Sequence, residues 1–307
     1  CMPDGGVVGE SKSDILSRID DPAVLKHAMI DGDGEGEPVE RAAITKQIIA
    51  ERNWSYPLIL KPDAAQRGAG VTLIESADDI ADYFEDSQGP AQLQQYHPGP
   101  KECGIFYTRL PSEAHGKIFS ITDKVFPIIV GDGQSNLEEL IWKHPRFRFQ
   151  HDVFHIRWAD DLERVLHKGE ELRLAEAGNH CQGTLFQDGA RLITPELEAR
   201  IDELAHRLEG FYFGRLDLRY TDEASLKRGE GIALIEINGV TSESTNLYDP
   251  GWSLWKAHAV LRKQWASCFA IGHAIRLRDG IKPKSGLRLL RDTLRYYRSR
   301  HVSTLSD

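Results

Sequence analysis

The chain has 307 residues, of which 38 are Lys or Arg and 47 are Asp or Glu, so its formal net charge is −9. This length supports a large buried core and predicts two or three packed subdomains. The acidic balance argues against nucleic acid as a partner, and apolar runs of only a few residues predict no membrane span, which needs about 20. Four dispersed cysteines without a Cys-x-x-Cys pair predict a reduced, cytoplasmic protein.

The first third of the chain predicts a compact module built around a glycine-rich loop. Residues 31–38 mix glycine with carboxylates and lack apolar periodicity, which favours a linker. After it we expect, in order, a helix, a strand, the glycine-rich loop, a second strand and a helix, over residues 39–53, 58–62, 66–70, 71–74 and 77–86.

The rest of the sequence mixes strands and helices without a regular βα repeat, which favours the α+β class. Strands are predicted at 93–96, 103–109, 116–122, 126–130, 171–174, 211–220 and 232–237. Helices are predicted at 136–143, 195–208, 253–276 and 287–300.

The C-terminal part differs from the rest in charge, because residues 256–307 carry 12 basic and 3 acidic side chains. Leu287, Leu290, Leu294 and Tyr297 form an apolar stripe at helical spacing. We expect this stripe to pack in the core or to contact a partner through the C-terminal helices, rather than to bind a membrane surface.

Lys61 ends a predicted strand just before the glycine-rich loop, a combination that suits a nucleoside triphosphate. Glycine lets backbone N–H groups approach phosphate oxygens closely, and a lysine adds positive charge. No Gly-x-x-x-x-Gly-Lys-[Ser/Thr] or Gly-x-Gly-x-x-Gly motif is present, so neither a P-loop nor a Rossmann site is predicted. On this loop alone, a hairpin with an exposed lysine is the simpler explanation.

Two later strands carry polar residues on one face. Because side chains alternate along a strand, Arg215 and Asp217 share a face, and so do Glu236 and Asn238. If the strands are neighbours, Asp217, Glu236 and Asn238 converge as oxygen ligands that suit a magnesium ion bridging phosphates. Arg215 would then lie beside them as an anion clamp. The alternative is a cross-strand salt-bridge face.

His180 lies in a polar stretch bounded by glycines at 178 and 183. A lone histidine is more often structural than functional. No Gly-x-Ser-x-Gly elbow supports a Ser–His–Asp hydrolase. We therefore interpret His180 only together with the residues around it.

Taken in this order, the motifs resemble the ATP-grasp superfamily from about residue 57 to residue 249. The resemblance implies an ATP-grasp fold with two α+β subdomains gripping ATP. In that family a strand lysine and a glycine-rich loop close over the phosphates, here Lys61 and Gly68, Ala69 and Gly70. A hinge strand contacts adenine and a later glutamate binds the ribose hydroxyls, here Gln94, Gln95, Tyr96 and Glu102. The magnesium ligands correspond to Asp217, Glu236 and Asn238.

Within the superfamily the chain is most similar to carboxylate–amine ligases of the D-alanine–D-alanine ligase, cyanophycin synthetase and glutathione synthetase kind. The resemblance implies an ADP-forming enzyme that activates a small-molecule carboxylate as an acyl phosphate for attack by an amine. It places His180 near the transferred phosphate and makes Lys124 and Arg109 extra phosphate or substrate contacts. Arg215 would help to hold the phosphates. The segment 239–243 directly follows the metal strand, and we expect it to help select the acceptor.

We expect four parts: an N-terminal remnant and linker, a lid subdomain, a catalytic core and a basic helical extension, over 1–38, 39–95, 96–251 and 252–307. Such ligases usually have a preceding small domain, and position 1 is Cys, so we expect a longer natural chain. Lys12, outside the lid, is expected to be a solvated surface charge. Two other functions stay open: a non-catalytic ATP-binding regulatory module, and an ATP-grasp kinase that acts on a hydroxyl.

Overall fold

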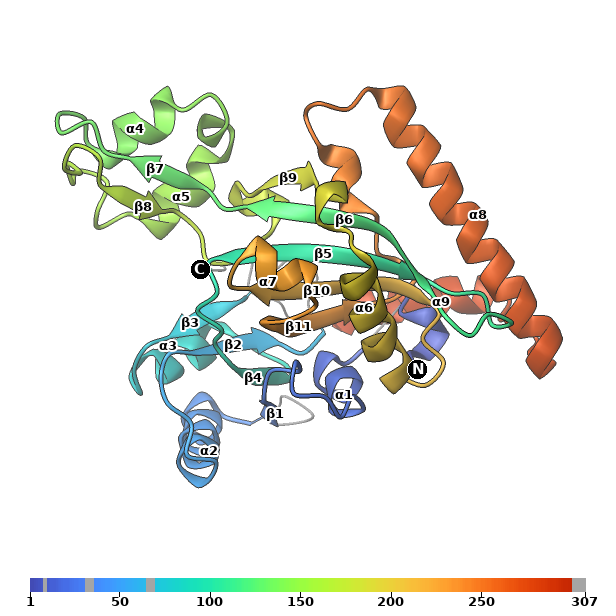
Figure 1. Cartoon of the computed structure of the whole chain (residues 1–307). Helices are drawn as coiled ribbons and strands as arrows, with labels where there is room; N and C mark the ends of the chain where they lie inside the picture. The colour runs from blue at the N-terminus through green and yellow to red at the C-terminus, as the bar shows by residue number, and fades with distance from the viewer. Residues whose placement is uncertain (8–9, 31–35, 65–69, 300–307) are drawn as a thin grey trace.

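The computed structural model describes residues 1–7, 10–30, 36–64 and 70–299. Its elements form two antiparallel sheets that lie one above the other, a small insert at one end and two C-terminal helices (Figure 1). The structure thereby confirms the α+β class. Within the described ranges there are also five short 3₁₀ helices: η1 (Pro3–Gly5), η2 (Phe147–Gln150), η3 (His180–Gln182), η4 (Ala190–Leu192) and η5 (Thr245–Tyr248).

The smaller main sheet has four strands in the order β1 (His27–Ile30), β4 (Ala91–Gln95), β2 (Leu58–Pro62) and β3 (Thr72–Ile74). Helices α2 (Pro38–Glu51) and α3 (Asp79–Asp86) contribute to the core on one face of it. Leu58 and Leu60 point into this core, so the alternation of a strand turns Ile59 and Lys61 to the opposite face. That opposite face lines the site described below.

The N-terminal segment contributes to this architecture, although the sequence analysis expected a remnant and a linker. Strand β1 pairs with β4, with Ile30 opposite Ala91. Helix α1 (Lys12–Ser17) packs with Ile15 and Leu16 in the core of the larger sheet. Residues 31–35 of the expected linker lie outside the described part of the chain. The boundaries of the four expected parts stay predictions.

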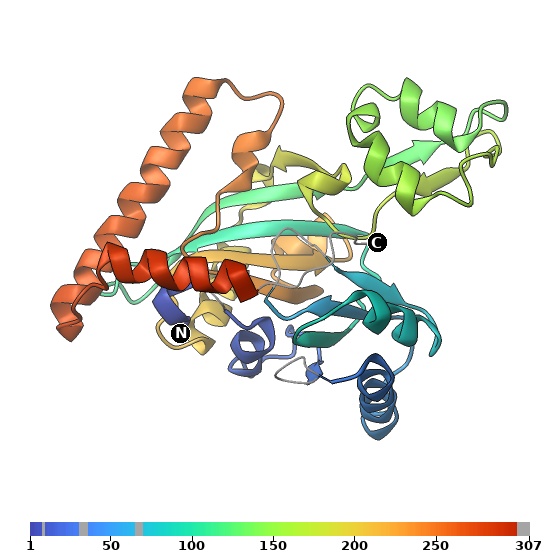
Figure 2. The same ribbon diagram turned by 180° about the vertical axis from the view of Figure 1, so that it is seen from behind.

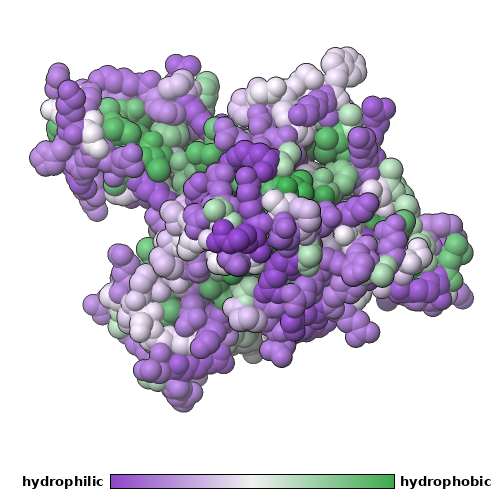
Figure 3. Space-filling model, viewed as in Figure 1, coloured by the Kyte–Doolittle hydropathy of each residue, from purple (hydrophilic) through white to green (hydrophobic). Residues whose placement is uncertain are grey.

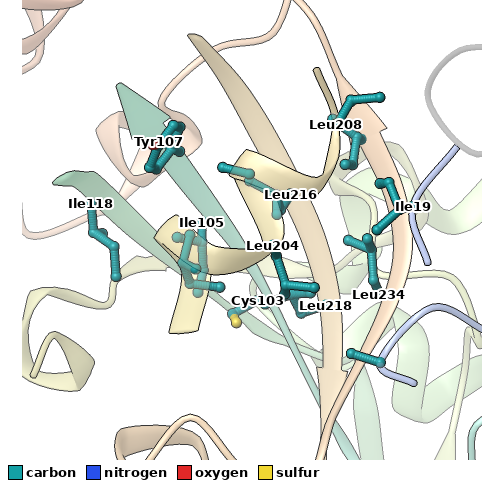
Figure 4. Close-up of a cluster of buried hydrophobic side chains, with 14 of the residues drawn as sticks. Ile19, Cys103, Ile105, Tyr107, Ile118, Leu204, Leu208, Leu216, Leu218 and Leu234 are labelled. Carbon is teal, nitrogen blue, oxygen red and sulfur yellow. The ribbon is translucent and has the colours of Figure 1, made fainter. Parts of the chain in front are cut away.

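The larger sheet has five antiparallel strands in the order β11 (Ile232–Asn238), β10 (Phe213–Tyr220), β5 (Lys101–Thr108), β6 (Lys117–Val125) and β9 (Leu185–Asp188). Helices α6 (Pro195–Arg207) and α7 (Glu223–Lys227) cover one face. Figure 4 shows how Leu204 of α6 lies against Leu216, Leu218 and Ile105 of the strands. These apolar residues alternate with charged ones, so the charged side chains of β10 and β5 point to the other face.

An insert subdomain lies between β6 and β9 in the chain. It consists of β7 (Ile128–Val130), α4 (Leu137–Lys143), α5 (His151–Arg157) and β8 (Glu171–Arg173) around its own apolar cluster. Figure 1 shows it beyond the end of the larger sheet. Several apolar side chains on its surface are exposed, and Figure 3 shows hydrophobic residues gathered on this part of the molecule. The sequence analysis predicted α4, β7 and β8, but not α5.

The chain ends in α8 (Leu254–Asp279) and α9 (Gly286–Ser299), which confirm the two predicted C-terminal helices. Ile271 of α8 is buried against Phe106 and Phe213 of the larger sheet. Figure 2 shows α9 crossing the back of the molecule. Just before α9 begins, Lys284 Nζ lies 2.5 Å from Asp4 Oδ2 of η1. None of the helices in the described residues combines the length and the hydropathy that crossing a membrane requires.

Candidate active site

The two main sheets enclose a cavity of about 620 Å³. Residues from both sheets, from the N-terminal segment and from the segment around η3 line it. Most of the predicted site residues are among them: Lys61, Gln94, Gln95, Tyr96, Glu102, Lys124, His180, Arg215, Asp217, Glu236 and Asn238. The fold therefore brings together side chains that are up to 177 positions apart in the sequence.

Lys61 is buried at the end of β2, with 4% of its surface exposed. Its Nζ donates to Gln94 Oε1 at 2.8 Å on the neighbouring strand β4 and to the Ile235 carbonyl at 3.5 Å on β11 of the other sheet. Burial lowers the pKa of Lys61 to about 8, although Glu236 opposes the shift. This is a desolvated ammonium group facing a cavity, and not the exposed hairpin lysine of the alternative explanation.

Asp217 lies at the centre of a charged cluster on the larger sheet. Its carboxylate accepts hydrogen bonds from Arg215 Nε and Nη2 at 3.1 Å each, and its Oδ1 lies 3.1 Å from Lys124 Nζ. Burial alone would raise the pKa of Asp217, but the charges of Arg215 and Lys124 bring it down to about 2. Asp217 is therefore fully ionised at neutral pH.

Glycine at position 104 makes this cluster sterically feasible. Gly104 of β5 lies opposite Asp217 in the register of β10, and between the strands that carry Asp217 and Lys124. A Cβ at this position would lie 3.0 Å from Asp217 Oδ1 and 3.0 Å from Arg215 Cδ. The sequence analysis missed this residue, because one glycine in a strand carries no local signal of a close approach.

Glu102 lies two residues before Gly104 on β5 and also faces the cavity. Its Oε1 accepts a 2.6 Å hydrogen bond from Lys124 Nζ, and its Oε2 lies 3.6 Å from Arg219 Nε. Burial opposes protonation of Lys124, but Asp217 and Glu102 together raise the pKa of Lys124 above its usual value. Lys124 is thus a permanent cation shared by two carboxylates.

Glu236 and Asn238 extend from β11 into the same cavity, and β11 is the antiparallel neighbour of β10. Asp217 pairs with Glu236 in the register, and Asn238 Nδ2 donates to Asp217 Oδ2 at 3.0 Å. The condition that the sequence analysis set for convergence, adjacent strands, is met. Two carboxylates and an amide oxygen are donors that suit Mg²⁺, so the residues present fit such an ion.

Two residues of the N-terminal segment face the same site and were missed from the sequence. Lys12 is buried, and its Nζ lies 4.0 Å from Glu236 Oε1, so the expectation of a solvated surface charge was wrong. Burial, with Glu236 second, raises the pKa of Glu10 to about 7. No motif marks either residue, because the contact arises when α1 packs beside β11.

The remaining predicted residues are placed as follows. Tyr96 donates to Glu176 Oε2 at 3.3 Å. His180 lies near Phe186 and Tyr248, and burial lowers the pKa of His180.

Gly70 takes a positive φ of 69° beside Pro62, next to the cavity residue Val71. Gly68 and Ala69 lie outside the described residues. Arg109, which was expected to be a further phosphate contact, does not line the cavity. Its guanidinium group lies over the Tyr212 ring, 4.6 Å from the ring centroid.

The segment that follows β11 also reaches the cavity. Thr241, Ser242 and Glu243 line it, and the Glu243 carbonyl accepts a 3.3 Å hydrogen bond from Arg215 Nη1. Tyr248 donates to Glu243 Oε2 at 2.8 Å. The segment thus lines the same cavity as the charged cluster, and its role in selecting the acceptor stays a prediction.

No family model and no curated protein sequence matches this chain. Similar solved structures include the bifunctional glutathione synthetase from Pasteurella multocida (14% identity, TM-score 0.41) and the VanG D-Ala:D-Ser ligase from Enterococcus faecalis (18%, 0.41). A third is the D-alanine–D-alanine ligase from Helicobacter pylori (12%, 0.39). The matches cover 86%, 82% and 82% of this chain, and 38%, 59% and 58% of those chains.

This chain thus spans less than two thirds of the length of each of these three structures. They are ligases of the kind that the sequence motifs resemble, and their similarity to this chain is low in both sequence and structure. We therefore base the function on the contacts that the chain's own residues make.

Proposed function

We propose that this protein is an ATP-dependent, ADP-forming ligase that activates a carboxylate as an acyl phosphate for attack by an amine. The observation that carries the proposal is the cluster of Asp217, Lys124 and Arg215, which faces Lys61 of the other sheet across one cavity. Phosphoryl transfer needs little covalent work from the protein, so positioning and charge neutralisation dominate. These residues give the cavity three cations for that purpose, of which Lys61 and Lys124 are buried and Arg215 is half-buried.

The cations have distinct places in the proposed reaction. Lys61, between the two sheets, would hold the phosphates of ATP from the side of the smaller sheet. Lys124 and Arg215, already held by Asp217, would neutralise the transferred phosphoryl group from the other side. Because fixed neighbours hold their positions, little reorganisation is needed when charge develops in the transition state.

A nucleoside also finds suitable groups in the same cavity. Ile59, Leu73 and Phe186 supply apolar lining that would flank the adenine ring, next to the hinge residues Gln95 and Tyr96. Glu102 still has acceptor capacity beyond its bond to Lys124, because a carboxylate has about four lone-pair positions. It would accept the ribose hydroxyls.

Mg²⁺ would be held by Asp217, Glu236 and Asn238, where it would neutralise phosphate charge as a Lewis acid. Asp217 is paired with Lys124 and Arg215, and Glu236 lies near Lys12, so these carboxylates are shared between cations. His180 and the segment 241–243 border the position where a carboxylate and an amine would meet. A screen of small carboxylates and amines would identify the two substrates.

The test is release of ADP from ATP and Mg²⁺ in the presence of pooled small carboxylates that carry no amino group, with and without pooled amines and amino acids. A ligase releases ADP and forms an amide only when both pools are present. A kinase forms ADP with hydroxyl compounds in the absence of carboxylates, and a regulatory module binds ATP without turnover. Either of these two results would overturn the proposal.

A further inference from the structure

The insert subdomain carries a cluster of one carboxylate and two imidazoles away from the cavity. Glu138 lies in the first turn of α4, and His151 and His155 lie one turn apart on α5. Glu138 Oε1 is 3.7 Å from His151 Nε2 and 3.7 Å from His155 Nδ1. One ligand atom from each residue lies within 4.8 Å of the others, and no second group of this kind occurs in the residues that the structure describes.

Hydrogen bonding does not account for this cluster. A distance of 3.7 Å exceeds the usual hydrogen-bond length of about 2.7–3.2 Å. His151 Nε2 is buried and has no hydrogen-bond partner. A buried polar atom without a partner is costly, and in native proteins it calls for an explanation such as an ion. The other ring nitrogen of His151 lies 3.4 Å from Asp152 Oδ1, which resembles the carboxylate that often orients a metal-binding histidine.

The core of the insert holds these side chains in place. Leu137 and Phe154, the chain neighbours of Glu138 and His155, are both fully buried in the apolar cluster of the insert. The centroid of the Trp142 ring lies 4.4 Å from that of the His151 ring, with the two planes tilted by 32°. In a tetrahedral site with metal bonds of about 2.0–2.1 Å, ligand atoms lie about 3.4 Å apart. The two observed distances of 3.7 Å from Glu138 therefore need only a small contraction, and the two histidine nitrogens, within 4.8 Å of each other, must also move closer together.

We propose that Glu138, His151 and His155 bind a divalent transition metal of the zinc class, which fixes α5 against α4. Two imidazoles with one carboxylate suit Zn²⁺ or Co²⁺, whereas Mg²⁺ prefers oxygen donors alone. Glu138 and His155 keep 35% and 49% of their side chains exposed, so an ion can enter from solvent. None of the three residues lines the cavity between the sheets. The site is thus separate from the proposed ATP site.

The test is calorimetric titration of Zn²⁺ into chelator-treated protein in excess Mg²⁺, which occupies oxygen-donor sites. Cys1 and Cys181 are exposed thiols that also bind zinc, so the protein carries Cys1→Ser and Cys181→Ser. We expect one Zn²⁺ per chain and a thermal midpoint that rises with zinc concentration. The absorption spectrum of bound Co²⁺ reports the ligand geometry without any assay of activity.

Matched variants assign the ligands. Glu138→Gln and His155→Ala should each weaken zinc binding by at least about tenfold, since even loss of an outer-shell partner typically costs about 10–100-fold. Glu139→Gln and His167→Ala, at exposed positions of the same insert, should leave binding unchanged. Circular dichroism and ATP binding confirm that each variant is folded. Absent zinc binding by the parent, or equal weakening in ligand and control variants, would overturn the proposal.

Discussion

Lys124 of β6 reaches the carboxylate of Asp217 on β10 across an intervening strand, with Nζ 3.1 Å from Oδ1. The strand between them, β5, carries Gly104 opposite Asp217 and Glu102 opposite Lys124. A Cβ at Gly104 would lie 3.0 Å from Asp217 Oδ1, so the missing side chain leaves room for this carboxylate. Removing one partner from a buried ion pair leaves an uncompensated charge, so both partners and the space between them matter.

Gly104→Val should disrupt this contact, because the new side chain would enter space that Asp217 and Arg215 occupy. We expect a large fall in ATP turnover and a lower thermal midpoint, since overpacking of a buried site typically costs about 1–3 kcal/mol. Gly272→Ala is the control, because a Cβ at Gly272 meets no atom within 4 Å. Calorimetry and ADP release measure the two effects. If Gly104→Val kept the ATP turnover and thermal midpoint of the parent, the cluster would have space for the added side chain and the prediction would be wrong.

Asp217→Asn should reduce ATP turnover by about two orders of magnitude, the usual effect of removing one preorganised electrostatic group. The substitution removes the charge that holds Lys124 and Arg215 in position and a proposed magnesium ligand. Asp160→Asn, at an exposed position of the insert, serves as the control. Initial rates of ADP release at saturating ATP decide the matter, with circular dichroism to verify folding. Near-normal turnover would remove Asp217 from the proposed site.

Lys61→Met should weaken ATP binding and change its pH dependence. The pKa of Lys61 is lowered to about 8, so the parent loses this positive charge as pH rises through 8, and its affinity for ATP should fall over that range. The variant lacks the charge throughout and should not show this fall. Lys46→Met, exposed on α2, should behave like the parent. Titration with ATP below and above pH 8 measures how the affinity depends on pH. The same pH dependence in the parent and in Lys61→Met would contradict the prediction.

Glu10→Gln should change how stability depends on pH. The pKa of Glu10 is raised to about 7 from 4.5, so the folded protein holds this proton more tightly than the unfolded chain. Stability from this group is therefore complete below pH 4.5 and is lost as pH rises through 7. We expect the thermal midpoint of Glu10→Gln to fall less than that of the parent over this range, and Glu85→Gln to match the parent. Equal falls of the thermal midpoint in the parent and in Glu10→Gln would mean that Glu10 is solvated and would contradict the prediction.

The sequence predicted the parts of the site that local patterns encode. Alternation along single strands placed Asp217 with Arg215 and Glu236 with Asn238, and the strand before the glycine loop identified Lys61. These predictions needed only the alternation of side chains along a strand and the assumption that the strands of Asp217 and Glu236 are neighbours. The pairing of β10 with β11 confirms that assumption.

Other parts depend on tertiary contacts that no local pattern shows. Lys12 and Glu10 reach the cavity only because α1 packs beside β11. Glu138 and His151 meet through packing of α4 on α5, and α5 itself was missed because its short amphipathic pattern follows a 3₁₀ turn. Strand β9 was missed for a similar reason, since its four residues gain their partners only from β6.

The most direct test of the central claim follows an oxygen atom. Carboxylates labelled with heavy oxygen are incubated with the protein, ATP, Mg²⁺ and amines, and the released phosphate is analysed by mass spectrometry. An acyl-phosphate intermediate transfers one carboxylate oxygen to phosphate, so we predict labelled phosphate in proportion to ADP. With Asp217→Asn, both should form about two orders of magnitude more slowly. ADP release with unlabelled phosphate, or release that does not depend on the carboxylate, would contradict the assignment of this cavity to carboxylate activation.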